Sequence, residues 1–236
     1  YDGIPDGKAL TGEANPLGYI LLLNKVRKEA PSTFAFFEQQ GVEIKVISGD
    51  NPLTVSETAK QAGIRNAERY IDARELKTEE ELEEAARNYT VFGRVVPEQK
   101  RQLVHALKRQ GRTVAMTGDG VNDVLALKDA DCSVAMASGS DAAAQASQVV
   151  LLESDFSKMP EVVLEGRRVV NNIQRSASLF LVKNIFSFLL SLFSLAFMIT
   201  YPLEPSQVSL ITMYTIGIPA FFLALQPNKD IIRGHF

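Results

Sequence analysis

Cysteine is nearly absent from this chain, since Cys132 is the only one among its 236 residues. A single cysteine excludes an intrachain disulfide and a metal site built from several cysteines, and it fits a reducing compartment. We expect Cys132 to be a small buried hydrophobic residue. Excess positive charge is also missing: the formal net charge is −3, which gives no reason to expect nucleic acid as a partner.

The N-terminus lacks two further features. Residues 1–19 contain no basic region followed by an apolar run, so they do not form a signal peptide. The first residue is Tyr1, with no initiator methionine, and we therefore expect the chain to be a fragment of a longer protein.

The first two thirds of the chain alternate between two kinds of segment. From Gly18 to about Leu152, short runs rich in Val and Ile alternate with helix-like segments, which predicts an α/β fold with a doubly wound parallel sheet. The expected strands are 19–24, 42–48, 89–95, 112–118, 132–136 and 148–153, and the expected helices are 30–41, 51–64, 78–88, 97–111, 121–130 and 140–147.

The pattern changes after residue 157, where two long apolar segments begin. We predict one long helix, with a stalk at 158–176 and a membrane span at 177–200, followed by a loop at 201–207, a second span at 208–226 and a tail at 227–236. The second span is interrupted at Gly217 and Pro219. The alternative is a buried helical hairpin in a soluble protein.

Basic residues indicate how these spans are oriented. Arg167, Arg168 and Arg175 precede the first span, Lys229 and Arg233 follow the second, and the connecting loop has none. Because basic residues stay on the cytoplasmic side, we expect a multi-pass protein of the cell membrane with its soluble domain in the cytoplasm.

Polar residues gather where three of the predicted strands end. These clusters are the Ser48–Asn51 stretch, Lys100 in "PEQK", and the Thr117–Asp123 stretch "TGDGVND". Ligands of open parallel sheets bind beyond the carboxyl ends of the strands, where hydroxyls, backbone N–H groups and a lysine suit a phosphate. Acids beside a phosphate suit Mg²⁺, so Asp119 is the expected direct ligand. Asp123 could orient a metal-bound water, hold the loop, or act only as a charge at a helix start.

Together these segments resemble a known family. "IKVISGDN", "VPEQK", "TGDGVNDVLALKDADCSVAM", "GRRVVNNIQR" and the final "QPN" resemble P-type cation-transporting ATPases, members of the haloacid dehalogenase-like superfamily, and in particular a bacterial calcium-pump-like subgroup. The resemblance covers nearly the whole chain. It implies that residues 1–157 are the C-terminal part of the phosphorylation domain.

The resemblance implies ATP-driven transport through an aspartyl phosphate, a covalent intermediate that divides one difficult phosphoryl transfer into two steps. In that comparison Ser48 and Gly49 contact the phosphoryl group, Lys100 neutralises it, and Asn122 and Asp123 complete the site. The implied catalytic residues are Ser48, Gly49, Asp50, Lys100, Asn122 and Asp123; the implied ATP contacts are Asn24, Arg27, Ser48, Gly49, Asp50 and Lys100; the implied Mg²⁺ ligands are Asp119 and Asp123.

The phosphorylated aspartate of the family is missing from the sequence. It lies in a "DKTGT" element, and no such run occurs here. We expect the chain to begin after that element, the nucleotide-binding insertion and the first four membrane helices, and to act only with these and the actuator domain. The isolated chain should neither form the phosphoenzyme nor pump. Asn24 also replaces the first Asp of the family's "DPLR"-like element, which puts one nucleotide contact in doubt.

Polar residues within the two spans suggest where an ion passes. Asn184, Ser187, Ser191 and Ser194 recur at helical spacing along the first span, and Thr212 and Thr215 precede the interruption of the second. Such faces indicate either an ion path or helix packing. The expected ion ligands are Asn184, Ser187, Thr212 and Thr215.

Comparison with calcium pumps changes the expected ion stoichiometry. Asn184 occupies a ligand position, whereas Ser187 replaces a Glu, Thr212 replaces an Asn and Ile216 replaces a shared Asp. With no acid at mid-membrane, a two-calcium site is disfavoured; calcium, magnesium, manganese and a monovalent ion stay open. Lys183 is expected to extend towards the membrane surface rather than to act as a built-in counter-ion.

Two other functions remain open. One is a phosphatase of the same superfamily attached to a membrane anchor, which the polar faces of the spans disfavour. The other is a non-catalytic regulatory subunit. The response of ATP hydrolysis to an ion separates a pump from an anchored phosphatase, because the phosphatase has no reason to respond.

Overall fold

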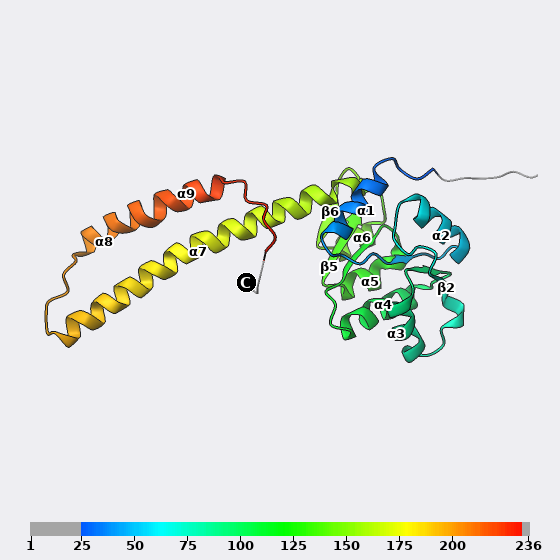
Figure 1. Ribbon diagram of the computed structural model, residues 1–236, viewed down its shortest axis with the longest axis horizontal. Helices are drawn as coiled ribbons and strands as arrows, with labels where there is room; N and C mark the ends of the chain where they lie inside the picture. Colours follow the sequence, from blue (N-terminus) through cyan, green and yellow to red (C-terminus); the bar gives the residue numbers. More distant parts are fainter. Residues whose placement is uncertain (1–24, 233–236) are drawn as a thin grey trace, which may run out of the picture.

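A computed structural model describes residues 25–232 of the chain. They form an α/β domain from which one long helix extends, and a shorter helical segment folds back along it (Figure 1). The predicted strand at 19–24, and with it Asn24, lies outside the described residues.

The strands of the domain are all parallel, as predicted, and form two three-stranded sheets. In one sheet the order is β1 (Val46–Ile47), β3 (Val91–Gly93), β2 (Tyr70–Asp72); in the other it is β4 (Ala115–Gly118), β5 (Cys132–Met136), β6 (Val149–Leu151). The sequence reading missed β2, which is only three residues long and half exposed. Parallel neighbours need crossover connections, and helices supply them.

Six helices connect or flank these strands. They are α1 (Ala30–Gln39), α2 (Pro52–Gln61), α3 (Glu79–Asn88), α4 (Pro97–Arg109), α5 (Val124–Asp129) and α6 (Asp141–Ala146), with short 3₁₀ turns at Ala73–Glu75, Val121–Asp123 and Phe156–Lys158. Local sequence explains several of the starts. The Asn51 side chain accepts a hydrogen bond from the Leu53 N–H at 3.0 Å, and Thr78 and Glu81 form a capping box.

Helix α4 packs against both sheets and joins them. Leu103 belongs to the apolar cluster around Phe92 of β3, whereas the next residue, Val104, belongs to the cluster around Met116 of β4. Polar contacts fasten α4 to α5 as well: Arg101 donates to Asp129, and this hydrogen bond holds the pKa of Asp129 below its ordinary value. The two halves of the domain are therefore held together through one helix.

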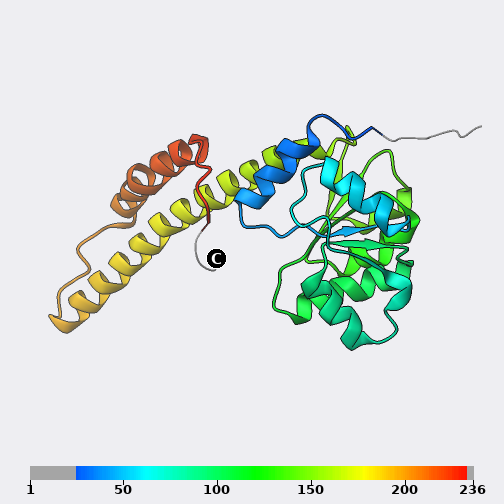
Figure 2. The ribbon, with the colours of Figure 1, turned by 45° about the vertical axis from the view of Figure 1, so that its right-hand side comes forward.

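The long helix α7 (Met159–Ala196) is anchored to the domain at its first turn. Phe156, just before it, contacts the rings of Phe34 and Phe37 in α1, with centroids 6.0 and 5.9 Å apart. Arg27 lies 3.5 Å from the Asp155 carboxylate at the same place. Figure 2 shows α1 alongside the beginning of α7. At 1.5 Å per residue, the 38 residues of α7 extend about 57 Å.

The apolar part of α7 and the segment that follows are each long enough to cross a membrane. Helices α8 (Pro205–Thr212) and α9 (Ile218–Leu225) are joined by a π-helical turn, Met213–Gly217, so the predicted interruption is a change of helical pitch rather than a break. Only 6% of each apolar window is buried, which disfavours a core hairpin. Helix α7 ends four residues before the predicted boundary at 200.

Two asparagines of α7 hold the end of α9 and the segment that follows it. Asn172 donates to the carbonyls of Ala224 and Gln226, each at 3.1 Å, and Asn171 donates to the Asp230 carbonyl at 3.0 Å. Both asparagines are buried. The two contacts of Asn172 satisfy carbonyls at the end of α9, and the contact of Asn171 holds the segment that follows it.

Replacing Leu103 with alanine should lower the free energy of unfolding of the α/β domain by about 2–5 kcal/mol, because it leaves a cavity where α4 contacts the first sheet. Leu103 is 2% exposed, whereas Leu125 on α5 is 41% exposed. Urea unfolding followed by circular dichroism measures the difference. Leu125→Ala is the matched control, and equal losses for the two variants would contradict the assignment of Leu103 to the core.

Candidate functional site

The loop after β1 carries the first group of predicted site residues. Ser48 extends the pairing of β1 with β3, because its N–H donates to the Phe92 carbonyl at 2.9 Å. Its hydroxyl donates to the Asp50 carboxylate and accepts from the Asp50 N–H, both at 3.2 Å. Gly49 and Asp50 are exposed. The loop therefore presents main-chain and hydroxyl groups to solvent at the carboxyl end of the sheet.

Lys100 and Asp123 form the central ion pair of the site. The Nζ atom of Lys100, in the first turn of α4, lies 2.7 Å from Oδ1 of Asp123, and the two side chains are only 12% and 10% exposed. Burial strengthens a charge-assisted hydrogen bond of this kind and makes the loss of either partner costly. The pair joins the element after β3 to the element after β4, so it links the two sheets at their carboxyl ends.

The backbone after β4 is shaped around Asp123. Its second carboxylate oxygen, Oδ2, accepts the Gly120 N–H at 3.1 Å. A Cβ atom on Gly118 would lie 2.6 Å from the Asp123 Cβ, which is closer than side chains approach one another. Both oxygens of Asp123 are thus used inside the protein. Its assignment as a Mg²⁺ ligand remains a prediction, and holding the loop and Lys100 is the role its contacts favour.

Asp119 and Asn122 lie exposed beside this pair. Within residues 25–232 the Asp119 carboxylate has no ion-pair partner, and no group of three or more His, Cys, Asp or Glu side chains could hold a metal. Mg²⁺ is commonly bound through one or two carboxylates while it keeps several waters. An exposed carboxylate beside a buried Lys–Asp pair fits that preference, so Asp119 remains the candidate ligand.

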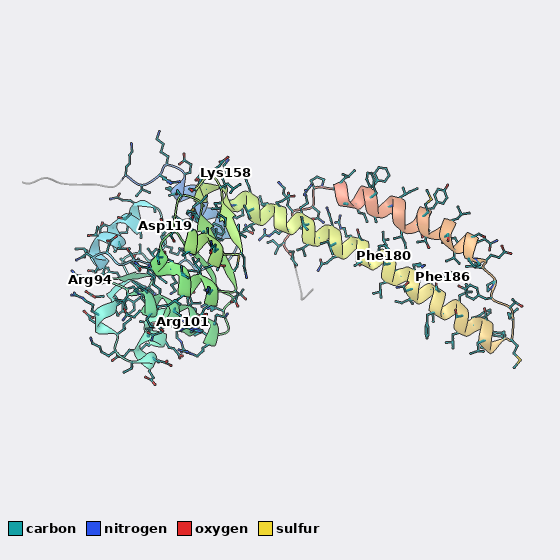
Figure 3. All side chains as sticks on the ribbon, turned by 180° about the vertical axis from the view of Figure 1, so that it is seen from behind. Arg94, Arg101, Asp119, Lys158, Phe180 and Phe186 are labelled. Carbon is teal, nitrogen blue, oxygen red and sulfur yellow. The ribbon has the colours of Figure 1, made fainter. Side chains whose placement is uncertain are left out.

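Arg94 is a candidate site residue that sequence reasoning missed. It follows β3 with a positive φ of 55°, and its N–H donates to the Asp50 carbonyl at 2.8 Å. Its side-chain Nε is buried without a hydrogen-bond partner and lies 3.6 Å from the Asp72 carboxylate. Arg74 donates to that carboxylate and, with Arg94, lowers the pKa of Asp72 to about 2. Figure 3 labels Arg94 in the α/β domain. The signal that could have identified it is its position directly after the buried strand β3.

The structure places the predicted ATP contacts in two separate regions. Ser48, Gly49 and Asp50 form one loop, and Lys100 lies with Asp123. Arg27 instead contacts Ser154 and Asp155 at the start of α7, with its guanidinium 3.3 Å from the Ser154 carbonyl.

The structure does not bring the four predicted ion ligands together in one cavity. A cavity of about 440 Å³ lies between α7 and the α8–α9 segment, and its lining residues are Phe180, Lys183, Val208, Ser209, Thr212, Met213, Ile216 and Gly217. Thr212 is the only one of the four predicted ligands in that lining. Asn184 and Thr215 are exposed, and Ser187 is half-buried. Lys183 also lines the cavity, and its extension towards the membrane surface remains a prediction.

Comparisons with known proteins agree with this architecture. The haloacid dehalogenase-like hydrolase model matches residues 4–131, and the chain belongs to that family. Within the family, the chain is similar to P-type cation-transporting ATPases, which confirms the resemblance stated from its motifs. It is 48% identical over 230 residues to the calcium-transporting ATPase CtpE of Mycobacterium bovis and 42% identical over 228 residues to the probable cation-transporting ATPase exp7 of Streptococcus pneumoniae.

These alignments include most of this chain but only part of its relatives. Each covers 93% of the chain, and the chain spans 29% of the length of each relative. A solved structure of a zinc-transporting PIB-type ATPase in its E2.Pi state shares the fold, with a TM-score of 0.62 and 22% identity over 86% of this chain and 28% of that one.

Removing one partner of the Lys100–Asp123 pair should destabilise the domain by about 3–5 kcal/mol, because the other charge stays buried without its partner. Removing both charges, as in Lys100→Met with Asp123→Leu, should cost less than the sum of the single changes. A double-mutant cycle from denaturant unfolding measures the coupling. Additive losses would contradict a direct interaction.

Proposed function

We propose that this chain is the C-terminal part of the phosphorylation domain, with two membrane-spanning helices, of an ATP-driven cation pump that works through an aspartyl phosphate. One observation carries the proposal. The buried Lys100–Asp123 pair and the exposed Asp119 lie at the strand ends of a domain whose last element, α7, continues as an apolar span. The likeness to cation-transporting ATPases supports it.

The side chains at the strand ends suit phosphoryl transfer. The Ser48–Asp50 loop offers a hydroxyl and main-chain donors to phosphoryl oxygens, and Lys100 supplies a positive charge that Asp123 holds in position. Asp119, with Asn122 near it in sequence, would hold Mg²⁺. When bound, that ion would neutralise charge on the transferring phosphoryl group. ATP is the substrate and Mg²⁺ the cofactor in this proposal.

The two sheets leave a place for the missing nucleophile. Within the described residues β1 pairs only with β3, and β4 only with β5, so each has one edge without a strand partner. Ser48 follows β1 and Asp119 follows β4. A strand from the remainder of the pump that pairs with both edges would bring an aspartate between these residues and complete one sheet.

The attachment of α7 provides a means of coupling. Phe156 packs against two phenylalanines of α1, and Arg27 pairs with Asp155, so the domain and the helix should turn together. If α7 also lines the ion path, a rotation of the domain would then move the part of α7 that lies in the membrane. In this proposal the apolar part of α7, from residue 177, and the α8–α9 segment lie in the cell membrane, with the stalk and the α/β domain in the cytoplasm.

The cavity beside the π-helical turn is the proposed ion path. A π-turn leaves a backbone carbonyl without its usual partner, and Thr212 adds a hydroxyl oxygen. Lys183 is the only charged residue of the cavity lining, and within residues 25–232 neither span contains an acid. We propose a single cation such as calcium, bound by neutral oxygens and by helices outside this chain, and the charge of Lys183 would oppose its binding.

The test of the proposed function uses the full-length protein in membrane vesicles. Radioactive ATP should give an acid-stable phosphoenzyme that depends on Mg²⁺ and on one cation, and Asp119→Asn should reduce its formation about 10²-fold or more. An anchored phosphatase would hydrolyse ATP with no response to any cation. Asp141→Asn, at the exposed start of α6, is the matched control and should leave phosphorylation unchanged.

Removing the Lys183 charge should strengthen cation binding. Two charges a few ångströms apart repel by about 4 kcal/mol in a medium of intermediate polarity, so Lys183→Met should lower the cation concentration for half-maximal ATPase activity about tenfold or more. Lys183→Arg keeps the charge and should stay near the original value. Identical cation dependence in all three proteins would show that Lys183 lies away from the ion.

A further inference from the structure

The loop between β5 and α6, residues 137–140, lies directly against the main chain of Asp119. A Cβ atom placed on Gly139 would lie 2.4 Å from the Asp119 carbonyl oxygen and 2.9 Å from its Cα. Real side chains do not approach backbone this closely, so only glycine allows the contact. The sequence reading assigned no role to this residue.

A hydrogen bond also joins this loop to the main chain of Asp119. The Ser140 N–H donates to the Asp119 carbonyl at 2.7 Å, and the Ser140 hydroxyl accepts the Ala143 N–H at the start of α6. The carbonyl of Asp119 is therefore held by a residue whose own position is determined by a helix cap. Because a side chain departs from its Cα, holding the Asp119 main chain limits where its carboxylate can lie.

The same loop is tied to the beginning of α7. The Ser138 N–H donates to the Ser154 hydroxyl at 2.8 Å, and the Ala137 N–H donates to the Leu151 carbonyl at 3.0 Å. Ser154 directly precedes Asp155 and the 3₁₀ turn that leads into α7. Figure 3 labels Asp119 in the domain and Lys158 at the start of the long helix. Residues 137–140 thus contact Asp119 on one side and the attachment of α7 on the other.

We propose that Gly139 is a positioning residue for the metal-binding carboxylate of Asp119. This inference rests on the proposed role of Asp119 as the Mg²⁺ ligand. Because residue 139 is glycine, the loop lies close enough for the Ser140 N–H to hold the Asp119 carbonyl. The same loop is hydrogen-bonded to Ser154 through Ser138. Gly139 contacts neither metal nor substrate, and it acts through Asp119.

Gly139→Ala should weaken Mg²⁺ binding about 10- to 100-fold, as is typical when a group that orients a ligand is lost. The measurement is the Mg²⁺-induced shift in melting temperature of the purified full-length protein, with Mn²⁺ binding followed by electron paramagnetic resonance. ATP binding measured without a divalent ion should be unchanged. That separation distinguishes a positioning role from general destabilisation.

Variants of Ser140 isolate the hydrogen bond. Ser140→Pro removes both the N–H and the cap hydroxyl, at a φ of −76° that proline adopts, whereas Ser140→Ala removes only the hydroxyl. Only the proline variant should weaken Mg²⁺ binding as Gly139→Ala does. Gly111→Ala controls for lost stability and should bind Mg²⁺ normally. Gly111 lies beyond the end of α4 at a φ of 77°, which strains alanine, but an added Cβ atom would have no neighbour within 4 Å.

The outcomes separate this inference from the proposed function. Normal Mg²⁺ binding in Asp119→Asn would remove the metal role of Asp119 and with it the basis of the proposal. Weakened binding in Asp119→Asn together with normal binding in Gly139→Ala would overturn the positioning role alone. If Gly139→Ala lowers the melting temperature even without Mg²⁺, the two Ser140 variants decide the question. Equal Mg²⁺ binding by Ser140→Pro and Ser140→Ala would then overturn the positioning role.

Discussion

The buried ion pair between Lys100 and Asp123 is the interaction on which the site depends. It joins the start of α4, which follows β3, to the turn that follows β4. Because each charge would be costly to bury alone, the pair stabilises the arrangement only while both sheets keep their relative position. The candidate phosphate-binding groups on one sheet and the candidate metal carboxylate on the other are thereby held at a common edge.

Apolar packing along α4 also holds the two sheets together. Leu103 and Val104 are consecutive residues, yet they face different apolar clusters. A helix can do this because successive side chains point about 100° apart around its axis. Within residues 25–232 no strand bridges the two sheets, but α4 connects them. This arrangement is compatible with a further strand entering at the edges of β1 and β4.

The linkage from the candidate site to α7 is short. Asp119 is held by the loop that contains Gly139, this loop contacts Ser154, and Phe156 packs the start of α7 against α1. Rigid elements joined by few contacts can transmit a rotation over a long distance. Further along α7, Asn172 holds the end of α9, so the two helical segments are also joined to each other.

Sequence alone determined the parallel α/β alternation, the two long apolar helices and the residues of the strand ends, because these follow from hydrophobic periodicity and local motifs. Tertiary structure decided which of them meet. It paired Lys100 with Asp123, used both oxygens of Asp123 inside the protein, and turned Lys183 rather than Asn184 towards α8. It also brought Arg94 against Asp50 and Gly139 against Asp119, through contacts between segments distant in sequence, which no local pattern encodes.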